Sequence, residues 1–172
     1  MRVSLIVACA APLAMATWLQ ARAHTFDEYP IYENTRFEPA PVNFGTASVA
    51  ARFRARLADG AKDGPNFAGH YTVVTLSCGA TCWRVAVINA LTGALTWFPR
   101  PSAMGVRYQL FSSLLIDGAP EDWQGGQPLT VPLPANAYTY YWHWTGRRFQ
   151  LVDSVRVPLR FTDTTTIPAR KP

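Results

Sequence analysis

The stretch that decides the fold spans residues 63–99 and reads DGPNFAGHYTVVTLSCGATCWRVAVINALTGALTWFP. Turn residues at its start lead into an apolar, β-branched run, Phe67–Ser77, whose alternating faces both carry apolar side chains. Because side chains on a strand alternate with a period of two, this pattern predicts a central strand that is covered on both faces. Two further runs, Trp83–Ala90 and Ala94–Phe98, follow after short turns, so the stretch predicts three consecutive antiparallel strands.

Two cysteines, Cys78 and Cys82, flank the turn between the first two of these strands. A disulfide here closes a loop of about five residues and is worth roughly 2 kcal/mol. A redox-active pair would prefer the spacing C-x-x-C at the start of a helix, and a zinc site would need a second pair of Cys or His ligands. We therefore expect a disulfide that clamps the turn, and we expect no metal site.

Several short motifs in and around this stretch resemble a family of uncharacterised exported bacterial proteins. They are N-F-A-G-H-Y at 66–71, C-G-x-x-C at 78–82, L-T-G at 91–93, A-P-V-N-F at 40–44, R-F-R at 52–54 and the aromatic hairpin that ends near residue 153. The resemblance covers roughly residues 39–153. It implies export, and it implies no particular activity or catalytic residues.

The remaining periodicity predicts one helix and further strands. Thr46–Ala58 has a capping residue at its start and an apolar stripe of Val49, Phe53 and Leu57, which indicates an amphipathic helix that ends at Asp59-Gly60. Later strands are predicted at Tyr108–Asp117, Leu129–Pro134, Ala137–Trp144, Arg147–Val152 and Val155–Phe161. The expected fold is mainly β, an antiparallel meander with one N-terminal amphipathic helix, arranged as a twisted sheet or in a propeller-like manner.

The first 23 residues have the pattern of a secretory signal peptide. Arg2 supplies the positive charge, an apolar segment follows, and Ala21-Arg22-Ala23 fits the small-residue cleavage pattern, with Ala14-Met15-Ala16 as an alternative site. Removing residues 1–23 also removes Cys9, which leaves an even pair of cysteines in the mature chain. Such a pair is typical of an oxidising compartment, so we expect a periplasmic or secreted protein.

The expected organisation is a signal peptide at 1–23, an N-terminal arm at 24–38, one β-rich domain at 39–161 and a flexible tail at 162–172. Cleavage lowers the formal net charge from +5 to +3, and no run of like charges suggests a nucleic-acid partner. We expect no membrane span once the signal is removed. Phosphate-binding and dinucleotide-binding motifs do not occur in the sequence, so no cofactor is expected.

His70 is the best candidate for a catalytic residue, because it follows Gly69 at the start of a strand, where its side chain can face a cleft. In a hydrolase it would act as a general base, oriented by an acid such as Asp117, with Ser77 or Ser112 as nucleophile. The nucleophile-elbow motif G-x-S-x-G does not occur. The alternative for His70 is a hydrogen bond to the backbone near the turn.

Large aromatic residues are the candidates for ligand binding. Tyr138, Tyr140, Trp142 and Trp144 share one face of a predicted strand, and Trp123 lies in the long loop before it. They either fill the core or form a platform for sugar rings or a partner protein. The leading hypothesis is an exported, non-enzymatic binding or inhibitor module that engages an envelope protein, such as a cell-wall hydrolase, or a cell-wall glycan. The alternative is a periplasmic hydrolase with the histidine as general base.

Overall fold

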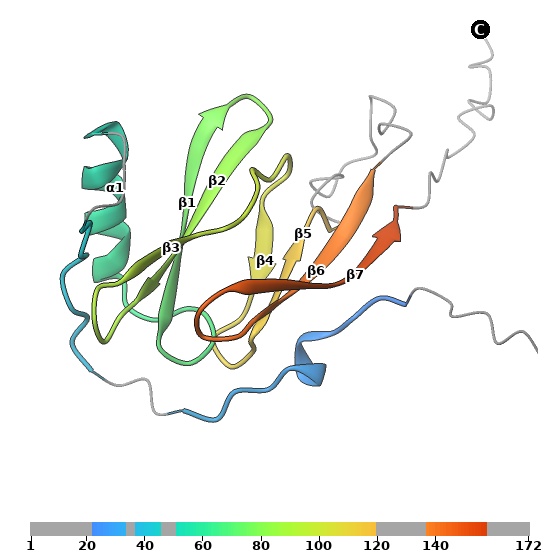
Figure 1. The fold of residues 1–172 in the computed structure, drawn as a ribbon, viewed down its shortest axis with the longest axis horizontal. Coiled ribbons are helices and arrows are strands. Elements are labelled where there is room, and N and C mark those ends of the chain that lie inside the picture. The colour runs from blue at the N-terminus through green and yellow to red at the C-terminus, as the bar shows by residue number, and fades with distance from the viewer. Residues whose placement is uncertain (1–21, 34–36, 46–50, 120–136, 158–172) are drawn as a thin grey trace, which may run out of the picture.

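The protein is mainly β in the computed structural model, which describes residues 22–33, 37–45, 51–119 and 137–157 (Figure 1). The described strands form two antiparallel sheets, one of three strands in the order β1-β2-β3 and one of four in the order β4-β5-β6-β7. Their bounds are β1 (Tyr71–Gly79), β2 (Cys82–Asn89), β3 (Leu95–Trp97), β4 (Val106–Tyr108), β5 (Leu114–Asp117), β6 (Tyr138–Trp144) and β7 (Phe149–Arg156). A helix, α1 (Ala51–Lys62), and a short 3-10 helix, η1 (Phe26–Glu28), complete the described elements.

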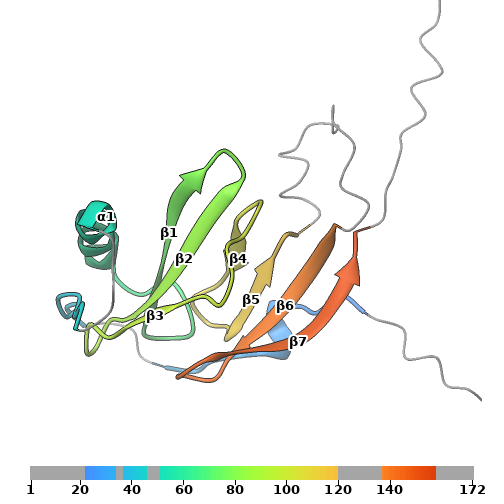
Figure 2. The ribbon, with the colours of Figure 1, turned by 45° about the horizontal axis from the view of Figure 1, so that its top comes forward.

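Two sheets are present where the sequence predicts one meander. Each sheet by itself is a meander, because its neighbouring strands are consecutive in the chain. The chain leaves the first sheet after β3 through Pro99 and Pro101, which cannot donate backbone hydrogen bonds and so cannot extend the ladder. In both views β4 lies on the side of the second sheet that is nearer to the first (Figures 1 and 2).

Two apolar cores lie on opposite faces of the three-stranded sheet. One core joins this sheet to the second sheet and contains Phe67, Tyr71, Val73, Val85, Val87, Phe98, Leu115 and Trp144. The other core joins the three-stranded sheet to α1 and contains Phe53, Leu57, Ala61, Val74, Leu76, Ala86 and Ile88. Accordingly, α1 covers the face of the three-stranded sheet that is turned away from the second sheet (Figure 2).

Strand β1 contributes to both cores, so the prediction that both of its faces are covered is confirmed. Tyr71 and Val73 belong to the core between the sheets, and Val74 and Leu76 belong to the core beneath α1. The prediction of a central position is wrong, because β1 lies at the edge of its sheet and β2 is the central strand. The two faces of a strand are covered by the layers that pack on its sheet, so an edge strand with one hydrogen-bonded neighbour can be covered on both faces.

Helix α1 ends later than predicted. The predicted start at Thr46 lies outside the described residues, and the helix continues past Asp59 and Gly60 to Lys62. Gly60 lets α1 approach β1 closely, since a Cβ atom at this position would lie only 2.9 Å from Cγ2 of Val74. The glycine therefore serves the packing of the helix and does not end it.

The predicted strand Tyr108–Asp117 is instead a hairpin of β4 and β5. The turn between them is bonded to distant segments. The carbonyl of Leu110 accepts a hydrogen bond from the N–H of Gly69 at 2.7 Å, and the carbonyl of Phe111 accepts one from Ile31 at 2.9 Å. These long-range bonds stabilise a turn that contains neither glycine nor proline, which is why the local sequence has the pattern of a continuous strand.

At the end of the described chain, β7 is a single strand where two are predicted. Asp153 pairs with Tyr141 and Leu151 pairs with Trp142, which leaves Val152 as a bulge between them. The bulge keeps both parts of the strand paired with β6. Several predictions fall outside the described residues: the strand Leu129–Pro134, the loop residue Trp123, most of the signal segment and the tail.

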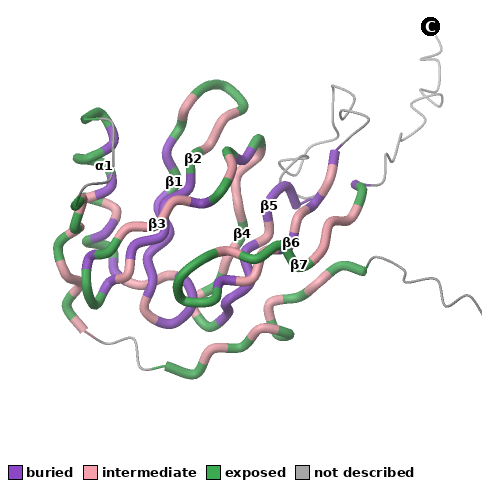
Figure 3. Tube along the Cα trace, viewed as in Figure 1, coloured by how far each residue is buried: buried purple, intermediate pink, exposed green. Residues whose placement is uncertain are grey.

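The Cys78–Cys82 disulfide closes the tip of the β1–β2 hairpin, as predicted. The two Cα atoms are 5.0 Å apart, and the residues between the cysteines are exposed. Figure 3 shows this end of the hairpin projecting beyond the buried part of the sheet. The bond therefore clamps an exposed turn and has no part in either core.

Candidate functional site

The loop at residues 66–71 forms a tight turn that presents His70 at the start of β1. The N–H of Phe67 donates to the carbonyl of Tyr71, and the N–H of Tyr71 donates back to the carbonyl of Phe67, both at 2.9 Å. Ala68 and Gly69 have φ angles of 44° and 81°. Glycine adopts this left-handed conformation without steric cost, which explains Gly69, whereas Ala68 has a side chain and bears that cost.

His70 is hydrogen-bonded through its Nδ1 atom to Oε2 of Glu33 in the N-terminal arm. The His70 side chain is 19% exposed, and its ring centroid lies 4.3 Å from that of Tyr71. Gly69 makes room for the pair, because a Cβ atom on Gly69 would lie 2.6 Å from Oε2 of Glu33. A histidine oriented by a carboxylate can transfer a proton or hydrogen-bond a ligand.

The acid beside His70 is not the one that the sequence suggests. Asp117 lies in β5, where its Oδ2 atom is 3.4 Å from Nε of Arg100. The two suggested nucleophiles, Ser77 and Ser112, each donate their hydroxyl hydrogen to a backbone carbonyl, at 3.4 and 2.9 Å. The structure thus gives His70 an acid partner from the arm, while both serines are engaged with backbone.

A groove of about 500 Å³ lies next to the histidine and its acid partner. It is lined by residues of the arm and of the β4–β5 turn, namely Asp27, Pro30, Ile31, Tyr32, Glu33 and Phe111. Tyr32 is 91% exposed and Phe111 is 58% exposed, the highest values for large apolar side chains among the described residues. Exposed aromatic side chains that gather in one place are common at surfaces of proteins that bind a partner. We term this surface the arm groove.

The backbone beneath the arm groove is fixed by hydrogen bonds. The N–H of Ile31 donates to the carbonyl of Phe111, and the N–H of Ser113 donates to the carbonyl of Tyr29, both at 2.9 Å. Pro30 forms a β-bridge with the same turn. The aromatic side chains of the arm groove therefore project from backbone that is tied to the four-stranded sheet.

The aromatic residues of β6 have two kinds of surroundings. Trp144 is 4% exposed, and its ring centroid lies 5.3 Å from that of Tyr71 in the core between the sheets. Trp142 is half-buried against the same core. Tyr138 and Tyr140 are also half-buried, with ring centroids 6.1 Å apart. Trp142 and Trp144 thus contribute to packing, and the two tyrosines keep part of their surface in solvent.

Asp117 is the only acidic or basic residue that is buried within the described ranges. Burial raises the pKa of its carboxyl group, and a hydrogen bond from Ser102 and the charge of Arg100 partly counteract this effect. The Arg100 guanidinium in turn lies over the ring of Tyr140, 4.1 Å from its centroid. This group of residues sits at the far end of β5 from the β4–β5 turn, and so it is separate from the arm groove.

Other features of the described chain are weaker candidates. A second hollow, of about 390 Å³, lies between α1 and residues 38–42 and is lined mainly by alanine and proline. No three His, Cys, Asp or Glu side chains come together to hold a metal ion in the part of the chain that the structure describes. None of the helices in that part is long and apolar enough to cross a membrane.

Sequence reasoning missed the arm groove. The segment at 24–38 has no strong period of apolar residues, which is why it is predicted as an irregular arm. The available signal was its unusual composition, since two tyrosines and three acidic residues occur within Asp27–Glu33.

A search of protein-family models, curated proteins and solved structures finds no match to this chain.

Proposed function

We propose that the protein is an exported, non-enzymatic binding module that holds a segment of an envelope protein in the arm groove. The observation that carries this proposal is the exposure of Tyr32 and Phe111 in a groove that also contains the carboxylates of Asp27 and Glu33. Aromatic rings offer apolar contact, and carboxylates bind ammonium and guanidinium groups. The matching partner is a protein segment in which Lys or Arg lies next to an apolar side chain.

The proposal of export is supported by two features of the chain. Residues 1–23 have the charge, the apolar segment and the cleavage pattern of a signal peptide. The Cys78–Cys82 disulfide is of a kind that persists in oxidising compartments. A periplasmic or secreted location would place the arm groove among envelope proteins.

The rigidity of the arm groove also suits binding. Its backbone is already hydrogen-bonded to the β4–β5 turn, so little backbone conformational entropy is lost when a partner binds. A preformed surface with two aromatic anchors is adequate for inhibiting an enzyme such as a cell-wall hydrolase, because the anchors can fill apolar pockets of the enzyme.

A comparative pull-down from envelope extract tests this function. The variant carries Tyr32→Ser and Phe111→Ser, and the control carries Leu151→Ala, which changes an exposed apolar residue on β7 outside the arm groove. We expect an envelope protein to be retained by the wild-type and control proteins and lost from the double variant. Retention of glycan alone would indicate a polymer ligand, and equal retention by all three proteins would contradict a role for the arm groove.

The hydrogen bond between His70 and Glu33 favours a second candidate function, hydrolysis with His70 as general base. A hydrolase would lose activity against ester or amide substrates in both His70→Ala and Glu33→Gln, with the folded state retained. A binding module would show no such activity in the wild-type protein. The same two variants in the pull-down then report whether the pair contributes to partner binding.

A further inference from the structure

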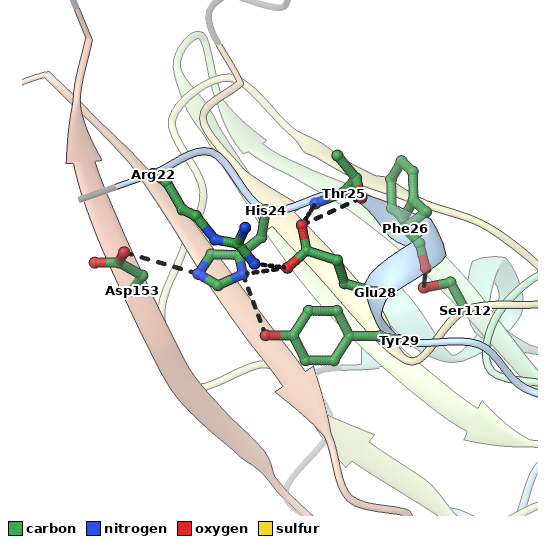
Figure 4. A network of polar contacts seen from close by, with 8 residues as sticks. All are labelled: Arg22, His24, Thr25, Phe26, Glu28, Tyr29, Ser112 and Asp153. Atoms are coloured by element: carbon green, nitrogen blue, oxygen red, sulfur yellow. Dashed lines mark hydrogen bonds and ion pairs between the residues drawn. The ribbon is translucent and has the colours of Figure 1, made fainter. Parts of the chain in front are cut away.

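The side chain of His24 lies at the centre of a polar cluster at the start of the arm (Figure 4). Its Nδ1 atom is 3.1 Å from Oε2 of Glu28, and the hydroxyl oxygen of Tyr29 is 3.3 Å from the same nitrogen. Its Nε2 atom faces β7, where it lies 3.7 Å from Oδ2 of Asp153. Both ring nitrogens of His24 therefore face oxygen atoms.

Packing and local structure hold His24 in this position. Its side chain is 14% exposed, and its ring packs edge-to-face on Tyr141 of β6 with centroids 5.2 Å apart. Thr25 begins η1 as its N-cap residue, and its N–H donates to Oε1 of Glu28 at 3.3 Å. The imidazole and the carboxylate are thus fixed relative to each other by the first turn of the arm.

Arg22 provides the cationic contact of the cluster, with Nη2 at 2.9 Å from Oε2 of Glu28. Cleavage after Ala23, which fits the small-residue pattern of the signal segment, would remove this guanidinium and make His24 the first residue. The backbone nitrogen of His24 would change from a peptide amide into a primary amine, which can donate an electron pair to a metal ion. Glu28 would lose a cationic partner in the same step.

We propose that this processing completes a Cu²⁺ site formed by the α-amine of His24, its Nδ1 atom and the carboxylate of Glu28. The amine and Nδ1 belong to one residue and close a six-membered chelate ring with the ion. Adjacent donor atoms that each lie about 2.0–2.2 Å from one ion are roughly 2.8–3.5 Å apart. The 3.1 Å separation of Nδ1 and Oε2 falls within this range.

Two further features select this site and this ion. Asp153 places a carboxylate oxygen 3.7 Å from Nε2, so a ring proton on Nε2 would face a negative charge while Nδ1 binds the ion. Copper(II) binds mixed nitrogen and oxygen donors more tightly than the other common divalent ions do. The described side chains do not form a metal-binding group of three by themselves, so the α-amine is the ligand that distinguishes the processed chain from its precursor.

This inference rests on the proposed export and cleavage, and it is independent of the arm groove and its partner. The test begins with the full chain, expressed with its own leader in a bacterial host and purified from the periplasm, and intact mass identifies its first residue. We expect the chain to begin at His24 and to bind one Cu²⁺ ion by calorimetric titration. The electron paramagnetic resonance spectrum should show coupling to two nitrogen atoms.

Variants of the same protein, titrated with Cu²⁺ under the same conditions, identify the groups that bind the ion. A chain that keeps residues 19–23 ahead of His24 should bind Cu²⁺ at least about tenfold more weakly, and so should Glu28→Gln and Asp153→Asn. His143→Ala is the control, because its ring lies 5.5 Å from that of Tyr29 but it is not among the proposed ligands, and it should bind as the wild type does. A first residue other than His24 would overturn both the cleavage and the site. Equal Cu²⁺ affinity of the processed and extended chains, or loss of binding in His143→Ala, would overturn the site alone.

Discussion

Oε2 of Glu33 lies 2.6 Å from the point that a Cβ atom on Gly69 would occupy, so the carboxylate fits there only because the glycine has no side chain. The same oxygen is hydrogen-bonded to Nδ1 of His70. The turn before β1 and the N-terminal arm are joined at this point. The arm groove borders this junction, because Glu33 is one of its lining residues.

Gly69→Ala is expected to lower the free energy of unfolding by about 2–4 kcal/mol. The positive φ of 81° costs a residue with a side chain about 1–2 kcal/mol, and the contact with Glu33 adds to this cost. Urea denaturation measures the loss. The control is Gly105→Ala, where φ is 94° and no atom lies within 4 Å of the added Cβ atom. Equal losses in the two variants would show that the contact with Glu33 has no effect.

Gly60→Ala should destabilise the protein, although alanine normally favours a helix over glycine by about 1 kcal/mol. The added Cβ atom would lie 2.9 Å from Cγ2 of Val74, and such overpacking typically costs about 1–3 kcal/mol. A double-mutant cycle with Val74→Ala, followed by chemical denaturation, should reveal favourable coupling between the two changes. A stabilised single variant would mean that α1 lies farther from β1.

Asp117→Asn is expected to raise the free energy of unfolding of the protein at neutral pH. Burial raises the pKa of the Asp117 carboxyl group, against the opposing effects of Ser102 and Arg100, so ionisation costs more in the folded than in the unfolded state. The cost is absent below the ordinary carboxyl pKa, appears as the pH rises above it, and reaches its full value above the raised pKa.

Thermal denaturation across the acidic and neutral range checks this prediction. The variant and the wild type should have similar melting temperatures at low pH, and the variant should gain an advantage as the pH rises. An advantage that is greatest at low pH would have the wrong sign for a carboxyl group with a raised pKa.

Replacing both cysteines, Cys78→Ser with Cys82→Ser, should lower the free energy of unfolding by about 2 kcal/mol, because the bond closes a loop of about five residues. The structural effect of the substitutions should be confined to the hairpin tip, since the residues between the cysteines are exposed and neither core includes them. Amide hydrogen exchange should therefore speed up at residues 77–83 and stay slow in the buried half of β2. Faster exchange throughout β2 would show that the disulfide supports the whole sheet.

Much of the fold could be predicted from local patterns. The three strands of the first sheet follow from alternating apolar residues and turn chemistry within one continuous stretch, and the disulfide follows from two cysteines that flank a turn. The β4–β5 hairpin could not be predicted in this way. Its turn is stabilised by hydrogen bonds from Gly69 and Ile31, which are far from it in the sequence and leave no local signal.

The candidate site, too, has one part that could be predicted from local sequence and one part that depends on distant segments. His70 was recognisable because it follows a glycine at the start of a strand, but its acid partner was not, since Glu33 lies 37 positions earlier in a segment without periodicity. By itself, the sequence determined the β-rich class, the paired cysteines and a histidine at the first turn, all of which depend on near neighbours. Only the tertiary structure decided which acid meets that histidine and where Tyr32 and Phe111 come together, because contacts between distant segments depend on how the layers pack.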